Sequence, residues 1–500
     1  MKRVPTAAAF IALIVYAASA LDDHPGHSAR LTVRTSPNMP VRIYLTRNGS
    51  PFRLHPVQAV LPIKVDVYYR DRLWLRDPDP EVFEAIHGDD SHFFLLKGLA
   101  HFSLPPGKYK LEAYRGFFYK PAAVEFELTN DSAREVTLPM ETWADPAEWI
   151  SSDDHIHLTR TKKDDSLYLQ WLAAEDLNVG NFLELQRQVQ AAPQYAYGKQ
   201  GEAVLGSYSI RTGEEARNEF FGHTNLLGIR QAVLPMSSGT MYANSSESYP
   251  FYSIFDKARL VGGTVGHAHF YLPPQHSTVI MDALLGKIDF IETLQFGELK
   301  TANWYLLLNS GLRFAGIAGS DFPVPLGRTK PWQKWLPLLG PERTLVKSRA
   351  KSYAAWAEGV RAGRAMVTNG PLVALQIAGG RAVATAAFYR PIELLEIIRN
   401  GEVVASGKGG RAEASADCAQ SCWFAARVRV EGGWVAHTNA EYILKDGRPV
   451  RVAADRARLA AIWDQEIAYW RGAGIRFASD AAGAEFWRLA EDVRKRLREE

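Results

Sequence analysis

The sequence has very little cysteine and no long apolar run beyond its first residues. Only Cys418 and Cys422 occur in 500 residues, so a zinc site built from several thiolates is excluded. No segment after residue 20 approaches the run of about 20 apolar residues that crosses a bilayer. Lys and Arg form no long runs and the net charge is only +3, which argues against nucleic acid or an anionic membrane surface as a partner.

The first twenty residues have the pattern of a secretory signal peptide. Lys2 and Arg3 precede a short apolar run, and Ala18-Ser19-Ala20 matches the cleavage pattern. We therefore expect residues 1–20 to be removed and the protein to be periplasmic or secreted, without an integral membrane segment; an uncleaved anchor is the alternative. In an oxidising compartment Cys418 and Cys422 could close a small disulfide, which we favour over two free thiols.

Five hundred residues exceed what one hydrophobic core usually serves. Alternating apolar and polar residues at 29–34, 41–45, 108–114 and 123–128 predict an N-terminal β-sandwich over residues 28–142. Beyond 371 the chain is β-rich again, with its clearest strand at 392–398. The last fifty residues are predicted to be helical, with an apolar stripe formed by Trp463, Ile467, Tyr469 and Trp470 that we expect to pack against the chain's own domains.

Strand and helix patterns alternate between residues 145 and 370. Helices are predicted at 167–175, 252–261, 279–285 and 302–309, and strands at 179–183, 264–266, 290–292 and 314–318. This alternation is typical of parallel α/β structure. Potential ligands recur where the strands end, which is where a (β/α) barrel assembles its active site.

The segment Asp153-Asp154-His155-Ile156-His157 is the most informative of these strand ends. Two histidines one residue apart on a strand project to the same face, so both imidazoles can reach one cation. The alternative is a strand end with two solvated or hydrogen-bonded imidazoles. The other strand-end acids and histidines are Glu184, Glu214, Glu215, His223, His267, His269, Glu292 and Asp321.

The order of these motifs resembles the PHP (polymerase and histidinol phosphatase) metallohydrolase superfamily. Residues 153–157 are similar to its opening D-x-H-x-H, and Gly262 to His269 to its G-G-x-x-x-x-A-H segment. The superfamily's glutamate and the histidine after it resemble Thr212 to Glu215 and Gly222-His223. Its late G-S-D motif resembles Ala318 to Asp321. Within the superfamily, the chain resembles the carbaryl-hydrolase-type CehA/McbA branch in the segments 285–292, 304–311, 362–371, 423–427 and 436–439.

The resemblance implies a distorted (β/α) barrel of PHP type over 145–370, followed by a C-terminal β-rich domain with a helical tail over 371–500. It implies one or two divalent ions, Zn, Mn or Fe. The implied metal ligands are His155, His157, Glu215, His223, His269 and Asp321. The implied catalytic residues are His223, His267 and Glu184, and His267, His276 and Asp154 are candidates to orient the ligating imidazoles.

Two positions depart from the superfamily pattern. Leu183-Glu184-Leu185 replaces the usual T-D-H, and Asp321-Phe322-Pro323 replaces the usual D-x-H, so we do not expect three metals. The expected activity is hydrolysis of an ester, amide or carbamate, or phosphoester bond in a small-molecule substrate. The alternatives are a PHP-like binding protein that has lost catalysis, or a carbohydrate- or surface-binding protein that uses its flanking β-domains.

Overall fold

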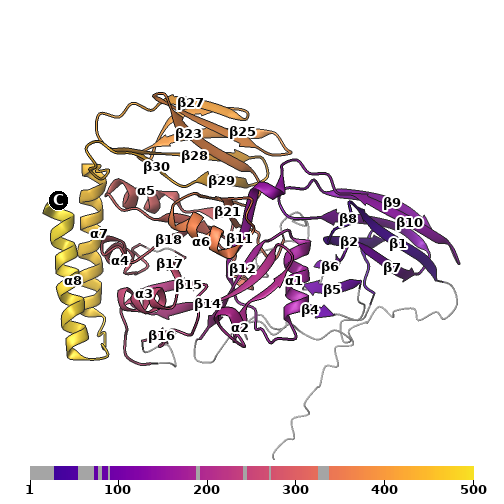
Figure 1. Cartoon of the computed structure of the whole chain (residues 1–500), viewed down its shortest axis with the longest axis horizontal. Coiled ribbons are helices and arrows are strands. Elements are labelled where there is room, and N and C mark those ends of the chain that lie inside the picture. The colour runs from indigo at the N-terminus through magenta and orange to yellow at the C-terminus, as the bar shows by residue number, and fades with distance from the viewer. Residues whose placement is uncertain are drawn as a thin grey trace, which may run out of the picture.

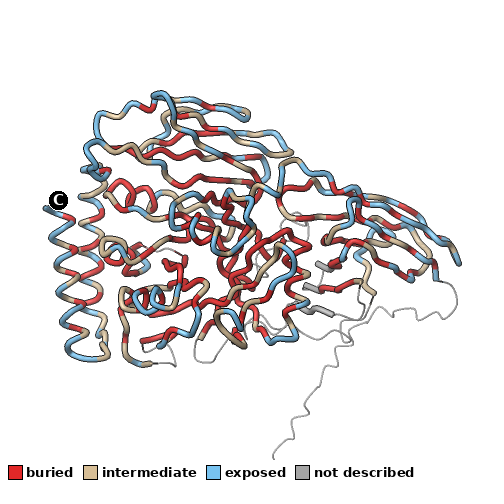
Figure 2. The backbone as a smooth tube through the Cα atoms, in the orientation of Figure 1, coloured by how far each residue is buried: buried red, intermediate tan, exposed pale blue. Residues whose placement is uncertain are grey.

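The computed structural model describes residues 28–54, 73–76, 81–87, 91–186, 192–239, 245–269, 272–324 and 337–499. Figure 1 shows the N-terminal sheets on one side of the central strands, the two terminal helices on the other, and the C-terminal sheets above them. Burial is densest in the central strands (Figure 2). The expected signal peptide lies outside the described residues. None of the helices described is both long and apolar enough to cross a membrane.

The N-terminal part is β-structure, and the four strands predicted there are confirmed. Its strands are β1 (Ala29–Ser36), β2 (Val41–Arg47), β3 (Ser50–Pro51), β4 (Leu73–Arg76), β5 (Val82–His87), β6 (Ser91–Leu96), β7 (Leu99–Leu104), β8 (Gly107–Tyr114), β9 (Ala122–Leu128) and β10 (Ala133–Pro139). They form a sheet of order β10-β1-β7 and a larger one of order β4-β5-β6-β2-β8-β9, with β3 paired to β2. Leu31 of the first sheet and Ile43 of the second belong to one buried cluster.

The central part alternates strands and helices, and every predicted element from 167 to 318 is confirmed with small shifts at its ends. The helices are α1 (Asp165–Ala174), α2 (Gly198–Gly201), α3 (Phe251–Leu260), α4 (Val279–Leu284), α5 (Thr301–Asn309) and α6 (Tyr353–Arg361). The strands are β11 (Trp149–Ile156), β12 (Val179–Leu185), β13 (Ala203–Leu205), β14 (Tyr208–Asn218), β15 (Gly222–Leu227), β16 (Ser237–Ser238), β17 (Thr264–Ala268), β18 (Phe290–Gln295), β19 (Glu298–Leu299), β20 (Ala315–Ala318), β21 (Arg343–Lys347) and β22 (Ala365–Thr368).

The central sheet is mixed rather than purely parallel. β11, β12 and β14 pair in parallel, as do β17, β18 and β20. β15 lies between these groups and is antiparallel to both β14 and β17, because a short turn joins it to β14 with no crossover helix. The described residues show no closed sheet; one isolated bridge, Ile156 to Phe322, joins the β11 end to the segment after β20. The predicted barrel is therefore not confirmed.

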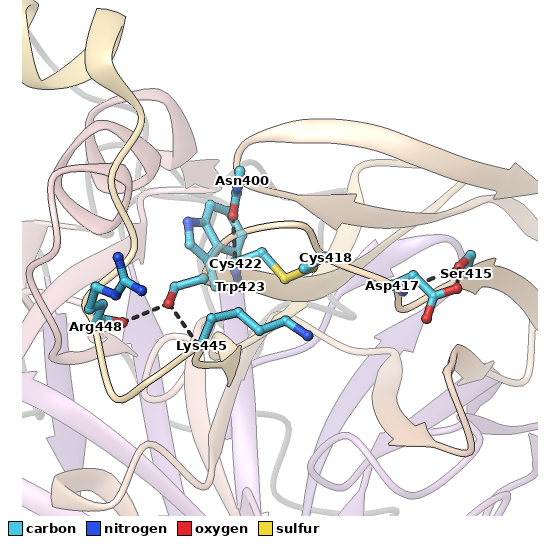
Figure 3. Close-up of a disulfide and its surroundings, with 9 residues drawn as sticks. Asn400, Ser415, Asp417, Cys418, Cys422, Trp423, Lys445 and Arg448 are labelled. Atoms are coloured by element: carbon cyan, nitrogen blue, oxygen red, sulfur yellow. Dashed lines mark hydrogen bonds between the residues drawn. A yellow bond between two sulfur atoms is a disulfide. The ribbon is translucent and has the colours of Figure 1, made fainter.

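The C-terminal strands continue the central sheet, since β22 pairs with β29 and β29 with β28. The strands are β23 (Leu372–Ala378), β24 (Arg381–Ala387), β25 (Ile392–Arg399), β26 (Glu402–Gly407), β27 (Arg411–Ser415), β28 (Cys422–Val430), β29 (Trp434–Thr438) and β30 (Glu441–Ile443). β23, β24 and β27 form a separate small sheet. Cys418 and Cys422 form the disulfide that we favoured, and Cys422 is the first residue of β28 (Figure 3).

Two helices, α7 (Ala453–Gly472) and α8 (Asp480–Glu499), end the chain. The predicted stripe on α7 is buried at Trp463, Ile467 and Trp470, whereas Tyr469 is partly exposed. Its partners are residues of α8 and of the central part, including Phe221 and Phe251. The expectation that this stripe packs within the chain is confirmed.

Candidate metal centre

The strand ends of the central sheet bring seven imidazole and carboxylate groups together. Their supporting segments are the β11 end, β14, β15, β18 and the residues directly after β17 and β20, which lie at the middle of the molecule (Figure 1). The seven residues are His155, His157, Glu215, His223, His269, Glu292 and Asp321. Six of them are buried, and His223 is half-buried with a side chain 24% exposed.

His155 and His157 direct their Nε2 atoms at each other across 3.0 Å. The Nδ1 of His157 lies 3.0 Å from the carbonyl oxygen of Leu183, and that of His155 lies 2.8 Å from Glu292 Oε1. Both oxygens accept, so each Nδ1 carries a hydrogen, and each ring in its neutral form presents a lone pair at Nε2. Two facing lone pairs repel each other unless a cation lies between them.

The same arrangement recurs at His269. Its Nδ1 donates to Gln295 Oε1 at 2.9 Å, which leaves Nε2 as the acceptor, 3.3 Å from Glu215 Oε1 and 3.8 Å from Asp321 Oδ2. Glu215 Oε2 lies 3.1 Å from His157 Nε2. Asp321 Oδ1 is 3.4 Å from that same nitrogen. The Nε2 atoms of three imidazoles and the oxygens of two carboxylates thus converge on one buried space.

His223 completes the cluster on its half-buried side. Its Nδ1 lies 3.0 Å from Glu215 Oε1, yet neither atom has a hydrogen-bond partner among the described residues. Buried polar atoms without a partner are rare in native structures and point to an unseen ion or water. Three overlapping groups could hold a metal ion: His155, His157 and Asp321; Glu215, His223 and His269; and His155, His269 and Glu292.

The third group has a supporting role. Glu292 accepts hydrogen bonds from His155 Nδ1, Asn225 Nδ2 and the backbone N–H of His269, at 2.8, 2.9 and 2.8 Å. Its oxygens therefore face the proton-bearing sides of the two imidazoles. Carboxylates in this position fix ring orientation and make the ligating nitrogen more basic. The sequence marks Glu292 only as an acid at a strand end, and its role becomes visible through these contacts.

The charges explain why the cluster suits a cation. Burial lowers the pKa of His155, but the carboxylates of Glu292 and Asp321 outweigh it and hold that pKa well above its usual value. Burial raises the pKa of Asp321, but His155 and His157 hold it below its usual value. In the protein alone, extra protons on the imidazoles balance the buried carboxylates. A divalent ion would replace those protons, since ligating histidines must be neutral.

Arg217 sets the charge of the central carboxylate. Its Nε and Nη2 both donate to Glu215 Oε2, at 2.9 and 2.6 Å. Burial raises the pKa of Glu215, but Arg217 and the surrounding histidines hold it well below its usual value. Burial and the Arg217 charge together lower the pKa of His223 to about 4, so this imidazole is neutral at pH 7.

Two of the predicted catalytic residues lie outside these groups. The Nε2 of His267 pairs with Asp282 Oδ2 at 2.9 Å, and its ring meets those of Phe251 and Phe255 edge-on. Strand alternation places His155 and His157 on one face, but it does not place His267 and His269 on one face, because the positive φ of His269, 57°, turns the chain after β17. His267 is therefore in a structural environment.

Glu184 lies on the opposite side of the strands from the cluster. It is paired with Glu214 across β12 and β14, and neighbouring residues on a strand face opposite sides, which directs Glu215 away from both. Glu184 accepts from the Tyr197 hydroxyl at 2.7 Å.

The two further candidates for orienting the imidazoles also bond elsewhere. Asp154 accepts from the Thr344 hydroxyl and the Asn181 amide. His276 pairs with Glu466 of α7 at 2.9 Å.

Asp153 supports the cluster in a way that the sequence did not predict. Its Oδ1 accepts from the backbone N–H groups of His155 and Ser320, and its Oδ2 accepts from that of Gly340. One buried carboxylate thereby ties the β11 end to the turn that carries Asp321. The only sequence signal for this role is its place in the D-D-H-I-H segment.

No family model and no curated protein matches the chain. Among solved structures, a two-domain protein containing a predicted PHP-like metal-dependent phosphoesterase from Bacteroides vulgatus ATCC 8482 aligns with 59% of this chain and 94% of its own, at 12% identity and a TM-score of 0.34. A TM-score of this size does not establish a common fold.

Proposed function

We propose that the protein is a metal-dependent hydrolase whose centre is the cluster around His155. One observation carries the proposal. His155, His157 and His269 each place their proton-bearing nitrogen on an oxygen acceptor and turn the other nitrogen toward Glu215 and Asp321. Structural histidines rarely share one space in this way, whereas metal ligands require it.

The ligands fall into two sets around the Glu215 carboxylate. His155, His157 and Asp321 would hold one ion, and His223, His269 and Glu215 a second. Mixed imidazole and carboxylate ligands favour Zn, Mn or Fe. When bound, such an ion would lower the pKa of a water molecule to about 7 and polarise the bond to be cleaved.

The remaining chemistry belongs to the side chains themselves. Arg217 keeps Glu215 ionised, and Glu292 and Leu183 keep the rings of His155 and His157 in one tautomer. His223 is neutral at pH 7 and half-buried. It either completes the second ligand set through the Nδ1 that lies 3.0 Å from Glu215 Oε1 or delivers a proton to the leaving group.

The motif order supports assignment to the PHP superfamily and, within it, to the CehA/McbA branch. The bond cleaved would be an ester, an amide or carbamate, or a phosphoester of a small molecule. The N-terminal pattern and the Cys418–Cys422 disulfide support an exported protein. Leu185 and Pro323 stand where the superfamily has histidines, which keeps the inactive binding protein as the second candidate.

The test begins with untagged protein lacking residues 1–20, so that no added histidines bind metal. Elemental analysis should find one or two equivalents of transition metal, and Mn²⁺, Zn²⁺ or Fe²⁺ should restore any loss. Loaded protein is then assayed with p-nitrophenyl acetate and bis(p-nitrophenyl) phosphate. No metal and no binding on titration would refute the proposal, and metal binding without hydrolysis across ester, carbamate and phosphodiester substrates would favour the inactive binding protein.

A further inference from the structure

The turn between β14 and β15 leads directly into His223 and is held by the C-terminal helix α7. The indole Nε1 of Trp470 donates to the carbonyl oxygen of Phe220 at 2.8 Å, across 250 residues of sequence. The next residue, Phe221, is fully buried. Its ring stacks on Phe486 of α8 at 5.2 Å and meets Trp470 edge-on at 6.1 Å.

The same turn is fixed on its other sides. Asn218 Oδ1 accepts from the backbone N–H groups of Phe220 and Phe221, at 2.9 and 3.2 Å. The backbone N–H of Thr278 donates to the Phe221 carbonyl at 3.1 Å. His223 follows as the second residue of β15 and pairs with Arg217 of β14. The backbone position of His223 is thus set by the turn and by these strands.

His223 depends on its backbone more than the other candidate ligands do. His155, His157 and His269 each have an Nδ1 hydrogen bond that fixes the ring. In the part of the chain that the structure describes, the His223 Nδ1 has no hydrogen-bond partner that fixes the ring; it lies 3.0 Å from Glu215 Oε1, and the side chain is 24% exposed. Its direction toward Glu215 therefore follows from where the turn places the start of β15.

We propose that the C-terminal helix pair is part of the metal centre, with Trp470 as a positioning residue that aligns His223 through the Phe220–Phe221 turn. The inference rests on the proposed function. Trp470 touches no ligand itself. Loss of its indole N–H frees the Phe220 carbonyl, loosens the turn and weakens the ligand set that contains His223, while the set of His155, His157 and Asp321 keeps its own hydrogen bonds.

Helix α7 offers a matched control. Trp463 is also fully buried, and its indole Nε1 donates to a backbone carbonyl, that of Ala490, at 3.0 Å. This bond stays within the helix pair. Trp463→Phe and Trp470→Phe therefore each remove one buried indole-to-carbonyl bond and keep an aromatic ring, but only Trp470→Phe releases the turn before His223.

The experiment titrates wild type and both variants with Mn²⁺, following bound ion by electron paramagnetic resonance and unfolding by calorimetry. We expect both variants to unfold at similarly lowered temperatures, and only Trp470→Phe to weaken Mn²⁺ binding, by about 10-fold or more. With a substrate in hand, kcat should fall more than KM changes in Trp470→Phe alone. Should that variant not fold, Phe221→Leu tests the same turn and should weaken Mn²⁺ binding in the same way.

Two failures are distinguishable. If wild-type protein binds no Mn²⁺, the proposed function fails and the inference with it. If wild type binds Mn²⁺ and the two tryptophan variants bind it equally well, the inference alone is overturned.

Discussion

Replacing Glu292 with glutamine is the sharpest test of how the metal centre is supported. Each oxygen of this buried carboxylate accepts from two donors. Oε1 accepts from His155 Nδ1 and Asn225 Nδ2 at 2.8 and 2.9 Å, and Oε2 from His269 N and Gln295 Nε2 at 2.8 and 3.3 Å. An amide NH₂ has no acceptor at either position, so either orientation of the new side chain deprives two donors of their partner.

The expected loss can be sized from this geometry. Changing the partner of a ligating histidine lowers metal affinity by about 10- to 100-fold, which corresponds to about 1.4–2.8 kcal/mol. Glu184→Gln is the matched control, because Glu184 is also a buried strand-end carboxylate but accepts from Tyr197 away from the cluster. Isothermal titration with Mn²⁺ measures both variants against wild type.

Three results would refute this reasoning about Glu292. Unchanged affinity in Glu292→Gln would mean that the carboxylate does not support the ligands. A loss far above 100-fold would mean that Glu292 ligates the ion itself. Equal losses in Glu292→Gln and Glu184→Gln would show a general effect of removing a buried charge.

Two other predictions concern histidines. His155→Ala should abolish Mn²⁺ binding in equilibrium dialysis. His267→Ala should keep it and instead lower the unfolding free energy by about 3–5 kcal/mol, because buried Asp282 Oδ2 loses its imidazole partner and keeps, among the described residues, only the Thr278 hydroxyl. The reverse pattern would show that His267, and not His155, supports metal binding. In metal-free protein, the raised pKa of His155 contributes stability that is complete below its unfolded pKa of about 6.5 and is lost as the pH rises through the folded value. Melting temperatures in EDTA should therefore fall between neutral and alkaline pH, and saturating Mn²⁺ should flatten that fall.

The elements of the central part could be predicted because their patterns are local. Helix 252–261 and strand 264–266 follow from periodicity and the intervening glycines, and the structure shifts their ends by one or two residues. The antiparallel insertion of β15 could not be predicted in this way. The direction of β15 is set by the turn at 219–221 and by pairing with β17. The local pattern of apolar and polar residues predicts neither of these features.

In the candidate site, too, residues that follow a local pattern could be predicted, and those that depend on distant contacts could not. Strand alternation correctly placed His155 and His157 on one face, and the motif order selected residues that the structure brings together. Alternation could not place His269, because a positive φ redirects the chain after β17. The supporting contacts of Glu292, Asp153 and Arg217 are long-range or depend on side-chain geometry, so their roles could not be assigned from sequence patterns.

The pairing of β22 with β29 has a consequence for how the protein could be shortened or exchanged. A fragment that stops near residue 370 would leave β22 with bare N–H and C=O groups along one edge, and such an edge invites aggregation. The central strands and the carboxy-terminal strands therefore form one continuous sheet that is expected to be inherited as a unit. Recombination that separates them would have to supply a substitute strand.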